Sequence, residues 1–113
     1  MQAVLTNKLG SSSRLICDHL GITPFLQAVV GAQDTAWLKP QPEFIAHTLK
    51  LVGASPDGAV MIGDSPYDIE AAHNAGLPAW VVTTGTHDAE QLRAARADAI
   101  YPDLNGIRVA LGL

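Results

Sequence analysis

The sequence predicts an α/β fold built on a doubly wound parallel sheet, because short apolar segments alternate with amphipathic ones along all 113 residues. Residues 59–62 form a continuous apolar run, which is typical of a strand buried on both faces. Residues 44–52 instead place apolar side chains at helical spacing and are followed by Gly53. Ligands of such sheets bind at the carboxyl ends of the strands, so we expect a functional site there.

In the first half of the chain the pattern predicts two strands and two helices. The expected strands are residues 3–6 and 28–30, and the expected helices are residues 11–20 and 42–52. Ser11 precedes the first helical pattern and Gly21 follows it, so we expect a serine N-cap and a glycine stop. Pro42 suits the first turn of the second helix, because the N–H that proline lacks has no helical partner at that position.

The second half continues the alternation. The expected strands are residues 59–62, 79–83 and 100–101. One helix is expected between Asp64 and Gly76, and a second after Asp88, where Asp88 and Gln91 form a capping-box-like pair. A closing helical turn is expected at residues 107–111. Gly85 follows the 79–83 strand near the expected site, and the sequence assigns it no chemistry.

Composition indicates a single folded domain over residues 1–113. Hydrophobic residues make up 48% of the chain and charged residues 16%, which excludes a disordered chain. The seven lysines and arginines are scattered and the net charge is −4, so we expect no nucleic-acid partner. There is one cysteine and no segment typical of a signal peptide or membrane span, so we expect no membrane association and a cytoplasmic location.

Two carboxylates follow the apolar run at 59–62. Gly63 lets the backbone turn, Asp64 stands at the carboxyl end of the strand, and Asp68 falls in the first turn of the next helix. We therefore expect the two carboxylates to lie close together. Magnesium binds a few carboxylates and keeps several waters, so Asp64 and Asp68 are candidate Mg2+ ligands. For these residues alone, the simpler alternative is a helix cap at Asp64 or Ser65 and a solvated acid at Asp68.

Two further segments provide the context in which Asp64 and Asp68 are interpreted. Thr6 ends the first expected strand and Asn7 follows it, and Lys39 opens a Lys-Pro-Gln-Pro-Glu segment before the 42–52 helix. Each segment alone is weak evidence for a functional role, because Thr-Asn is common in turns and a lysine before proline is usually solvated. In this order, together with Gly-Asp-Ser-Pro-Tyr-Asp at 63–68, the set resembles the haloacid dehalogenase superfamily of phosphohydrolases, closest to its phosphoglycolate phosphatase-like branch. The resemblance covers nearly the whole chain.

The resemblance implies a Rossmann-like fold and a role for each of these residues. Thr6 would be the phosphate-binding hydroxyl, with Asn7 contributing from the adjacent turn. Lys39 would bind phosphate and neutralise negative charge in the transition state. Asp64 would bind Mg2+ directly, and Asp68 through water or by orienting the site, which leaves Lys39 and Asp64 as the catalytic residues. The implied reaction is magnesium-dependent hydrolysis of a small phosphorylated metabolite through an aspartyl-phosphate.

The chain departs from the family where the nucleophile is expected. In the family that aspartate belongs to an Asp-x-Asp-Gly-Thr-like motif at the end of a first strand, and no two aspartates here are separated by a single residue. We therefore expect an incomplete core, with the first strand and the inserted cap domain absent, and no phosphatase activity from this chain alone. The alternative is a noncatalytic module that binds phosphate or magnesium, or that oligomerises.

The absent strand would lie in the middle of the sheet, between the strands at 3–6 and 59–62. Its absence leaves unpaired backbone groups, which are costly when buried and promote aggregation when exposed. Direct pairing of the two strands, pairing with another copy of the chain, or a separate amino-terminal half would fill the gap. We therefore expect a homo-oligomer or a complementing amino-terminal half as partner.

Overall fold

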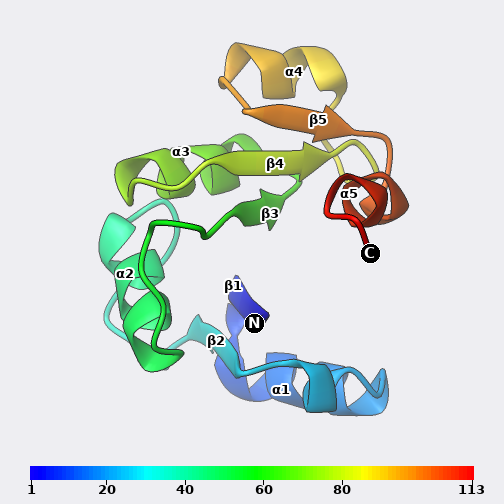
Figure 1. Cartoon of the computed structure of the whole chain (residues 1–113). Helices are drawn as coiled ribbons and strands as arrows, with labels where there is room; N and C mark the ends of the chain where they lie inside the picture. Colours follow the sequence, from blue (N-terminus) through cyan, green and yellow to red (C-terminus); the bar gives the residue numbers. More distant parts are fainter. The chain divides into compact units, whose positions relative to one another are not determined.

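The computed structural model describes all 113 residues, and strands alternate with helices along the chain (Figure 1). The chain divides into two compact units, Met1–Ser55 and Pro56–Leu113. Each unit contains one sheet, and every strand pair in both sheets is parallel. The predicted α/β class and parallel pairing are therefore confirmed. The single domain over residues 1–113 stays a prediction.

The first unit contains two strands, two α-helices and a short 3-10 helix. In chain order these are β1 (Ala3–Leu9), α1 (Gly10–His19), η1 (Thr23–Phe25), β2 (Ala28–Ala32) and α2 (Pro42–Leu51). β1 pairs with β2, with Ala3 beside Ala28 and Leu5 beside Val30, and the register shifts between Leu5 and Leu9. The sequence predicts all of these elements except η1, and β1 continues past its expected end.

The second unit contains three strands and three helices. In chain order these are β3 (Met61–Gly63), α3 (Pro66–Asn74), β4 (Ala79–Val82), α4 (Ala89–Ala94), β5 (Ala99–Tyr101) and α5 (Leu104–Ala110). The strands lie in the order β3-β4-β5. Each of these elements corresponds to one predicted from the sequence. No helix in the structure has the length and apolar character needed to cross a membrane.

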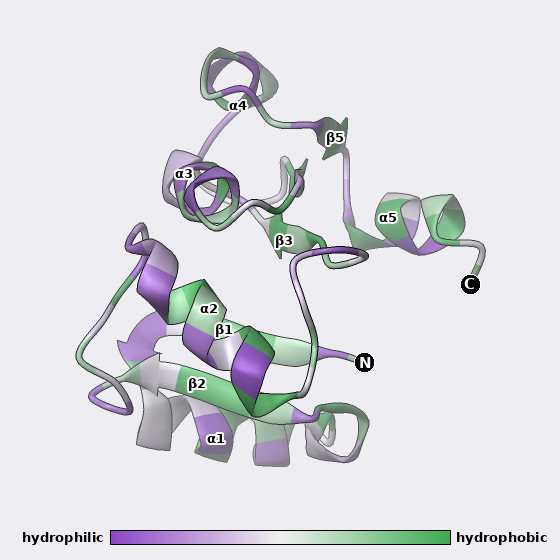
Figure 2. Ribbon diagram, turned by 60° about the vertical axis from the view of Figure 1, so that its left-hand side comes forward, coloured by the Kyte–Doolittle hydropathy of each residue, from purple (hydrophilic) through white to green (hydrophobic).

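Apolar side chains of the strands and helices form the core of each unit. In the first unit, Val30 of β2 and Phe44 and Ile45 of α2 are buried. In the second, Ile69 of α3 and Val81 of β4 are almost completely buried. Figure 2 colours the chain by hydropathy: β2 is apolar along its length, whereas much of α3 is hydrophilic. Burial of these side chains is the main favourable contribution to folding of such elements.

One helix cap is as predicted and another is not. At α4, the Gln91 N–H donates to Asp88 Oδ1 at 2.8 Å and the Asp88 N–H donates to Gln91 Oε1 at 2.9 Å, which confirms the capping box. The serine cap expected for α1 is wrong: the N-cap residue is Leu9, with no side-chain cap. The reason is that β1 extends to Leu9 and runs directly into α1, so Ser11 already lies inside the helix.

Candidate functional site

The turn between β3 and α3 is closed by the buried carboxylate of Asp68. This side chain is 4% exposed, and its Oδ2 accepts hydrogen bonds from the Asp64 N–H at 3.0 Å, the Ser65 N–H at 3.2 Å and the Ser65 hydroxyl at 3.2 Å. Ser65 is the N-cap residue of α3, and Asp68 is its third residue. The alternative of a cap at Ser65 is therefore correct, whereas the alternative of a solvated acid at Asp68 is wrong.

Two glycines give these carboxylates the room they occupy. A Cβ atom on Gly63 would lie 2.3 Å from Asp68 Oδ2, and a Cβ atom on Gly85 would lie 2.0 Å from Asp64 Oδ2. Both distances are far below van der Waals contact, so a side chain at either position would displace a carboxylate oxygen. Gly85 follows β4, the strand beside β3, so it reaches Asp64 from the neighbouring strand end.

Asp64 and Asp68 have different capacities for binding a metal ion. The half-buried Asp64 stands directly after β3, with one carboxylate oxygen against Gly85. Asp68 Oδ2 is already engaged by three hydrogen-bond donors of the turn. No group of three or more histidine, cysteine, aspartate or glutamate side chains in the structure forms a metal cage. The carboxylates of Asp64 and Asp68 are a donor set that fits Mg2+, because this ion commonly binds proteins through one or two carboxylates and keeps several waters.

The first unit joins Asn7 to Lys39, and Thr6 precedes Asn7 in the irregular part of β1. Thr6 Oγ1 accepts a hydrogen bond from the Lys8 N–H at 3.1 Å, across the part of β1 where its register with β2 shifts. The Asn7 side chain donates from Nδ2 to the Lys39 carbonyl at 3.1 Å and accepts at Oδ1 from the Lys39 N–H at 2.9 Å. Asn7 and Lys39 are therefore linked by two hydrogen bonds, although they lie far apart in the sequence.

The five site residues predicted from the sequence thus form two groups. Thr6, Asn7 and Lys39 belong to the first unit, and Asp64 and Asp68 belong to the second. Thr6 and Asn7 lie inside β1, because this strand continues to Leu9, and not at a strand end and in the adjacent turn as expected. Lys39 lies in the loop before α2, Asp64 directly follows β3, and Asp68 lies in the first turn of α3.

The sequence comparison decides the family. Residues 1–82 match the family model described as haloacid dehalogenase-like hydrolase, and this range includes all five residues of the candidate site. The chain belongs to the haloacid dehalogenase-like hydrolases. The resemblance noted from the Thr6, Lys39 and Asp64 segments is therefore confirmed.

Phosphoglycolate phosphatases are among the curated relatives of this haloacid dehalogenase-like chain. It is 32% identical to the enzyme of Mesorhizobium japonicum over 109 residues, which are 96% of this chain and 48% of that protein. It is 37% identical to the enzyme of Caulobacter vibrioides over 97 residues, which are 86% of this chain and 40% of that protein. The chain spans about half the length of the curated relatives it matches.

Solved structures show the same relationship in three dimensions. The crystal structure of a predicted phosphoglycolate phosphatase from Haemophilus somnus 129pt matches with a TM-score of 0.88 and 28% identity, covering 96% of this chain and 48% of that one. A predicted phosphatase from Clostridium acetobutylicum matches with a TM-score of 0.87 and 28% identity, covering 98% of this chain and 52% of that one. The strands and helices of the haloacid dehalogenase-like chain therefore follow those of solved structures described as predicted phosphatases.

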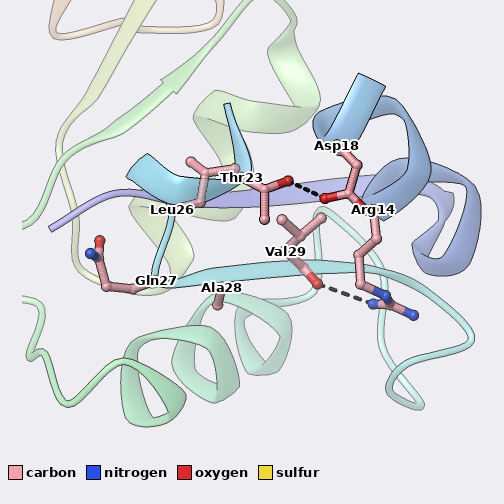
Figure 3. A pocket seen from close by; sticks show the side chains of 7 residues that line it. All are labelled: Arg14, Asp18, Thr23, Leu26, Gln27, Ala28 and Val29. Atoms are coloured by element: carbon pink, nitrogen blue, oxygen red, sulfur yellow. Dashed lines mark hydrogen bonds between the residues drawn. The ribbon is translucent and has the colours of Figure 1, made fainter. Parts of the chain in front are cut away.

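A pocket of about 330 Å³ in the first unit lies apart from the predicted site residues. Side chains from α1, η1 and the start of β2 line it, and Thr23 donates to Asp18 Oδ1 at 2.6 Å beside it (Figure 3). Arg14 is the one cationic side chain that lines the pocket, and it is already bound by other groups of the protein. Its Nη1 donates to the Val29 carbonyl, and both Nη atoms donate to the Asp34 carboxylate. The Arg14 guanidinium and the Gly31 N–H lower the pKa of the Asp34 carboxyl, so this ion pair ties α1 to the end of β2.

Sequence reasoning missed the parts played by Gly85 and Asn7. The available signal for Gly85 was its position just after a strand, since parallel strands end at the same edge. No comparable signal existed for the contact of Asn7 with Lys39, because asparagine after a strand fits an ordinary turn equally well.

Proposed function

We propose that this chain supplies the phosphate-binding and magnesium-binding half of a phosphomonoester hydrolase site. The observation that carries the proposal is the position of Asp64, held at the end of β3 between the Asp68 turn and Gly85. The phosphoglycolate phosphatases among its relatives support a small phosphorylated metabolite as substrate. A cytoplasmic location is part of the proposal and agrees with the single, buried and free thiol of Cys17.

In this proposal the first unit binds the phosphoryl group. The Thr6 hydroxyl accepts a hydrogen bond from the Lys8 N–H, and a hydroxyl that accepts keeps its own hydrogen for donation to a phosphate oxygen. The Lys39 ammonium opposes the negative charge that develops on the phosphoryl oxygens. Both interactions are stronger with a dianionic ester than with its alcohol product, so they favour phosphomonoesters over neutral ligands.

The second unit holds the metal ion in this proposal. Asp64 binds Mg2+ through its carboxylate, and Asp68 fixes the backbone from which Asp64 extends. When bound, Mg2+ would supply positive charge that stabilises negative charge on a reacting phosphoryl group. Asp64 would be one of few protein ligands, and Mg2+ commonly completes such a coordination shell with water.

Hydrolysis through an aspartyl-phosphate also needs a carboxylate nucleophile, with a second acid two residues later. No aspartate pair of this chain has that spacing. We therefore assign the nucleophile to a partner, either a complementing amino-terminal half or another polypeptide that pairs with the open strand edges. A noncatalytic module that binds phosphate or magnesium, or that oligomerises, is the alternative.

Magnesium titration and a phosphatase assay test this proposal. We expect Asp64→Asn to weaken Mg2+ binding to the full chain about tenfold, because a neutral amide is a weaker ligand than a carboxylate. Glu70→Gln, which neutralises an exposed carboxylate in the same unit, is the matched control and should bind Mg2+ as the parent does. The chain alone should not turn over p-nitrophenyl phosphate. Turnover on the order of 1 per second with a trapped acyl-phosphate, or equal Mg2+ affinity of Asp64→Asn and parent, would contradict the proposal.

A further inference from the structure

Asn7 lies in the irregular part of β1. The regular pairing of β1 with β2 ends at Leu5 and resumes at Leu9, so residues 6–8 lie outside the ladder. Irregularities of this kind bend a strand and redirect its side chains, often next to functional sites. Here the bend is stabilised by the hydrogen bond from the Lys8 N–H to Thr6 Oγ1. The Asn7 side chain is directed toward the loop that carries Lys39.

The Asn7 amide holds both peptide planes that flank the Cα atom of Lys39. The Lys39 N–H, which donates to Asn7 Oδ1 at 2.9 Å, belongs to the peptide plane before that Cα atom. The Lys39 carbonyl, which accepts from Asn7 Nδ2 at 3.1 Å, belongs to the plane after it. Restraining both planes restrains φ and ψ of Lys39, and these angles set the direction of its Cα–Cβ bond. The side chain that carries the ammonium therefore leaves the backbone in one direction.

The assignment of oxygen and nitrogen in the Asn7 amide follows from its partners. A backbone N–H can only donate and a backbone carbonyl can only accept, so the oxygen must face the Lys39 N–H and the nitrogen must face the Lys39 carbonyl. The reversed amide would place two donors together and two acceptors together. The Asn7 amide is thus engaged through both its oxygen and its nitrogen by the backbone of Lys39.

The loop before Lys39 is held independently of Asn7. The Leu38 N–H donates to Gln41 Oε1 at 2.9 Å, and the Gln41 N–H donates to the Leu38 carbonyl at 2.8 Å. Thr35 Oγ1 also accepts a hydrogen bond from the Trp37 N–H at 3.0 Å. Loss of the Asn7 amide would therefore leave the loop in place and loosen mainly the Lys39 peptide. Because Asn7 is exposed, we also expect its removal to be tolerated by the fold.

We propose that Asn7 is a positioning residue, which aims Lys39 at the bound phosphate by holding its backbone. This inference rests on the proposed function, because it assigns the Lys39 ammonium to phosphate. The sequence predicted that Asn7 contacts phosphate directly, whereas in this inference Asn7 acts on phosphate binding through Lys39. The energetic consequence is specific: Asn7 contributes to phosphate binding only while residue 39 carries a positive charge.

A double-mutant cycle on inorganic phosphate binding tests this inference. The parent chain, Asn7→Ala, Lys39→Met and the double variant are titrated with inorganic phosphate and followed by calorimetry. Methionine keeps the length and backbone of Lys39 while removing the ammonium. We expect Asn7→Ala to weaken phosphate binding about tenfold in the parent and to have no effect in the Lys39→Met background. Asn74→Ala, at an exposed asparagine that ends α3, is the control and should bind phosphate as the parent does.

The other outcomes separate the two proposals. An equal loss from Asn7→Ala in both backgrounds would overturn the positioning role, because it would mean that Asn7 binds phosphate itself or only stabilises the unit. Absence of phosphate binding by the parent would overturn the proposed function and with it the inference. Hydrogen exchange at the Lys39 amide provides a second measurement: it should be faster in Asn7→Ala than in the parent, and unchanged exchange would show that Asn7 does not hold this peptide.

Discussion

At the scale of single residues, the contact between Gly85 and Asp64 is a sharp constraint on the candidate metal site. A Cβ atom on Gly85 would lie 2.0 Å from Asp64 Oδ2 and 2.8 Å from Asp64 Cγ. The backbone of Gly85 does not adopt the positive φ that favours glycine, so the restriction at this position is space. Any side chain here must push the Asp64 carboxylate away, and the turn held by Asp68 limits how far the backbone can follow.

We predict that Gly85→Ala weakens Mg2+ binding more than it weakens folding. Rotation of the half-buried Asp64 side chain relieves the contacts with Oδ2 and Cγ, and a small backbone shift relieves the contact with Asp64 Cβ at 2.9 Å. We expect the two adjustments to cost about 1 kcal/mol in the free energy of unfolding. The same rotation moves the ligand oxygen, and Mg2+ tolerates little distortion of its geometry. Magnesium titration followed by NMR, with urea unfolding in parallel, measures both effects.

Gly106→Ala is the matched control for this prediction. It makes the same substitution in the same unit, but the nearest atom to the added Cβ is Tyr101 Cδ1 at 3.3 Å, and no carboxylate lies within the contacts of that position. We expect Gly106→Ala to bind Mg2+ as the parent does. Unchanged Mg2+ affinity in Gly85→Ala would show that Asp64 is free to bind the ion from another position.

The sequence was more informative about the chemistry of individual residues than about their contacts. Asp64 and Lys39 were identified because their segments match a family pattern that extends over a few consecutive positions. The contact between Gly85 and Asp64 and the contact between Asn7 and Lys39 join residues that are distant in the chain. Such contacts depend on how loops pack, and local pattern carries no record of that packing.

At the scale of elements, Asp98 links α3, β4 and β5 of the second unit. Its Oδ2 accepts a hydrogen bond from the Ala79 N–H at 2.7 Å and lies 2.8 Å from His73 Nε2, while its own N–H donates to the Ala79 carbonyl at 2.9 Å. The Ala79 N–H, followed by His73, lowers the pKa of the Asp98 carboxyl. The charged form of Asp98 is thus favoured in the folded protein.

The lowered pKa of Asp98 has a definite consequence for stability against pH. A carboxyl group with a lower pKa in the folded state stabilises that state above its unfolded pKa of about 3.9, and loses this effect as pH falls through the folded value. We therefore predict that Asp98→Asn lowers the free energy of unfolding at pH 7 by about 1 kcal/mol or less, since the side chain is partly exposed. The difference between variant and parent should shrink below about pH 4.

Urea unfolding at pH 7, 4 and 2, followed by tryptophan fluorescence, measures this difference, and Trp80 of β4 reports on the second unit. Glu70→Gln removes an exposed carboxylate of α3 and should follow the parent at every pH. A difference between Asp98→Asn and parent that grows as the pH falls would contradict the assigned sign.

Element positions were predictable where amphipathic patterns were long. α2 begins at Pro42 as expected, and α4 has the predicted pairing of Asp88 with Gln91. The end of β1 was not predictable, because the strand passes through an irregular segment after Leu5 and then continues to Leu9. That extension removed the loop in which Ser11 would have capped α1. One unrecognised irregularity thus accounts for both errors.

At the scale of the whole molecule, both units present a strand with one open edge. β1 has β2 as its only ladder partner, and β3 has β4 as its only ladder partner. An edge strand carries backbone N–H and C=O groups that are available for pairing with another chain. The edge strand β3 also carries an exposed apolar side chain: Ile62 is 40% exposed. Native edge strands usually carry charges or prolines that block such pairing, and β3 has neither.

We predict that the 113-residue chain self-associates through these edges, with a dimer as the simplest closed form. Ile62→Lys places a charge on the edge of β3 and should shift sedimentation toward the monomer, because pairing would desolvate the ammonium group. Leu20→Lys makes the same change in net charge at a side chain that is 63% exposed at the end of α1, and should associate as the parent does. Sedimentation velocity over a wide concentration range is the measurement. A parent chain that stays monomeric at every concentration would contradict the prediction, and equal effects of the two lysines would place the contact outside the strand edges.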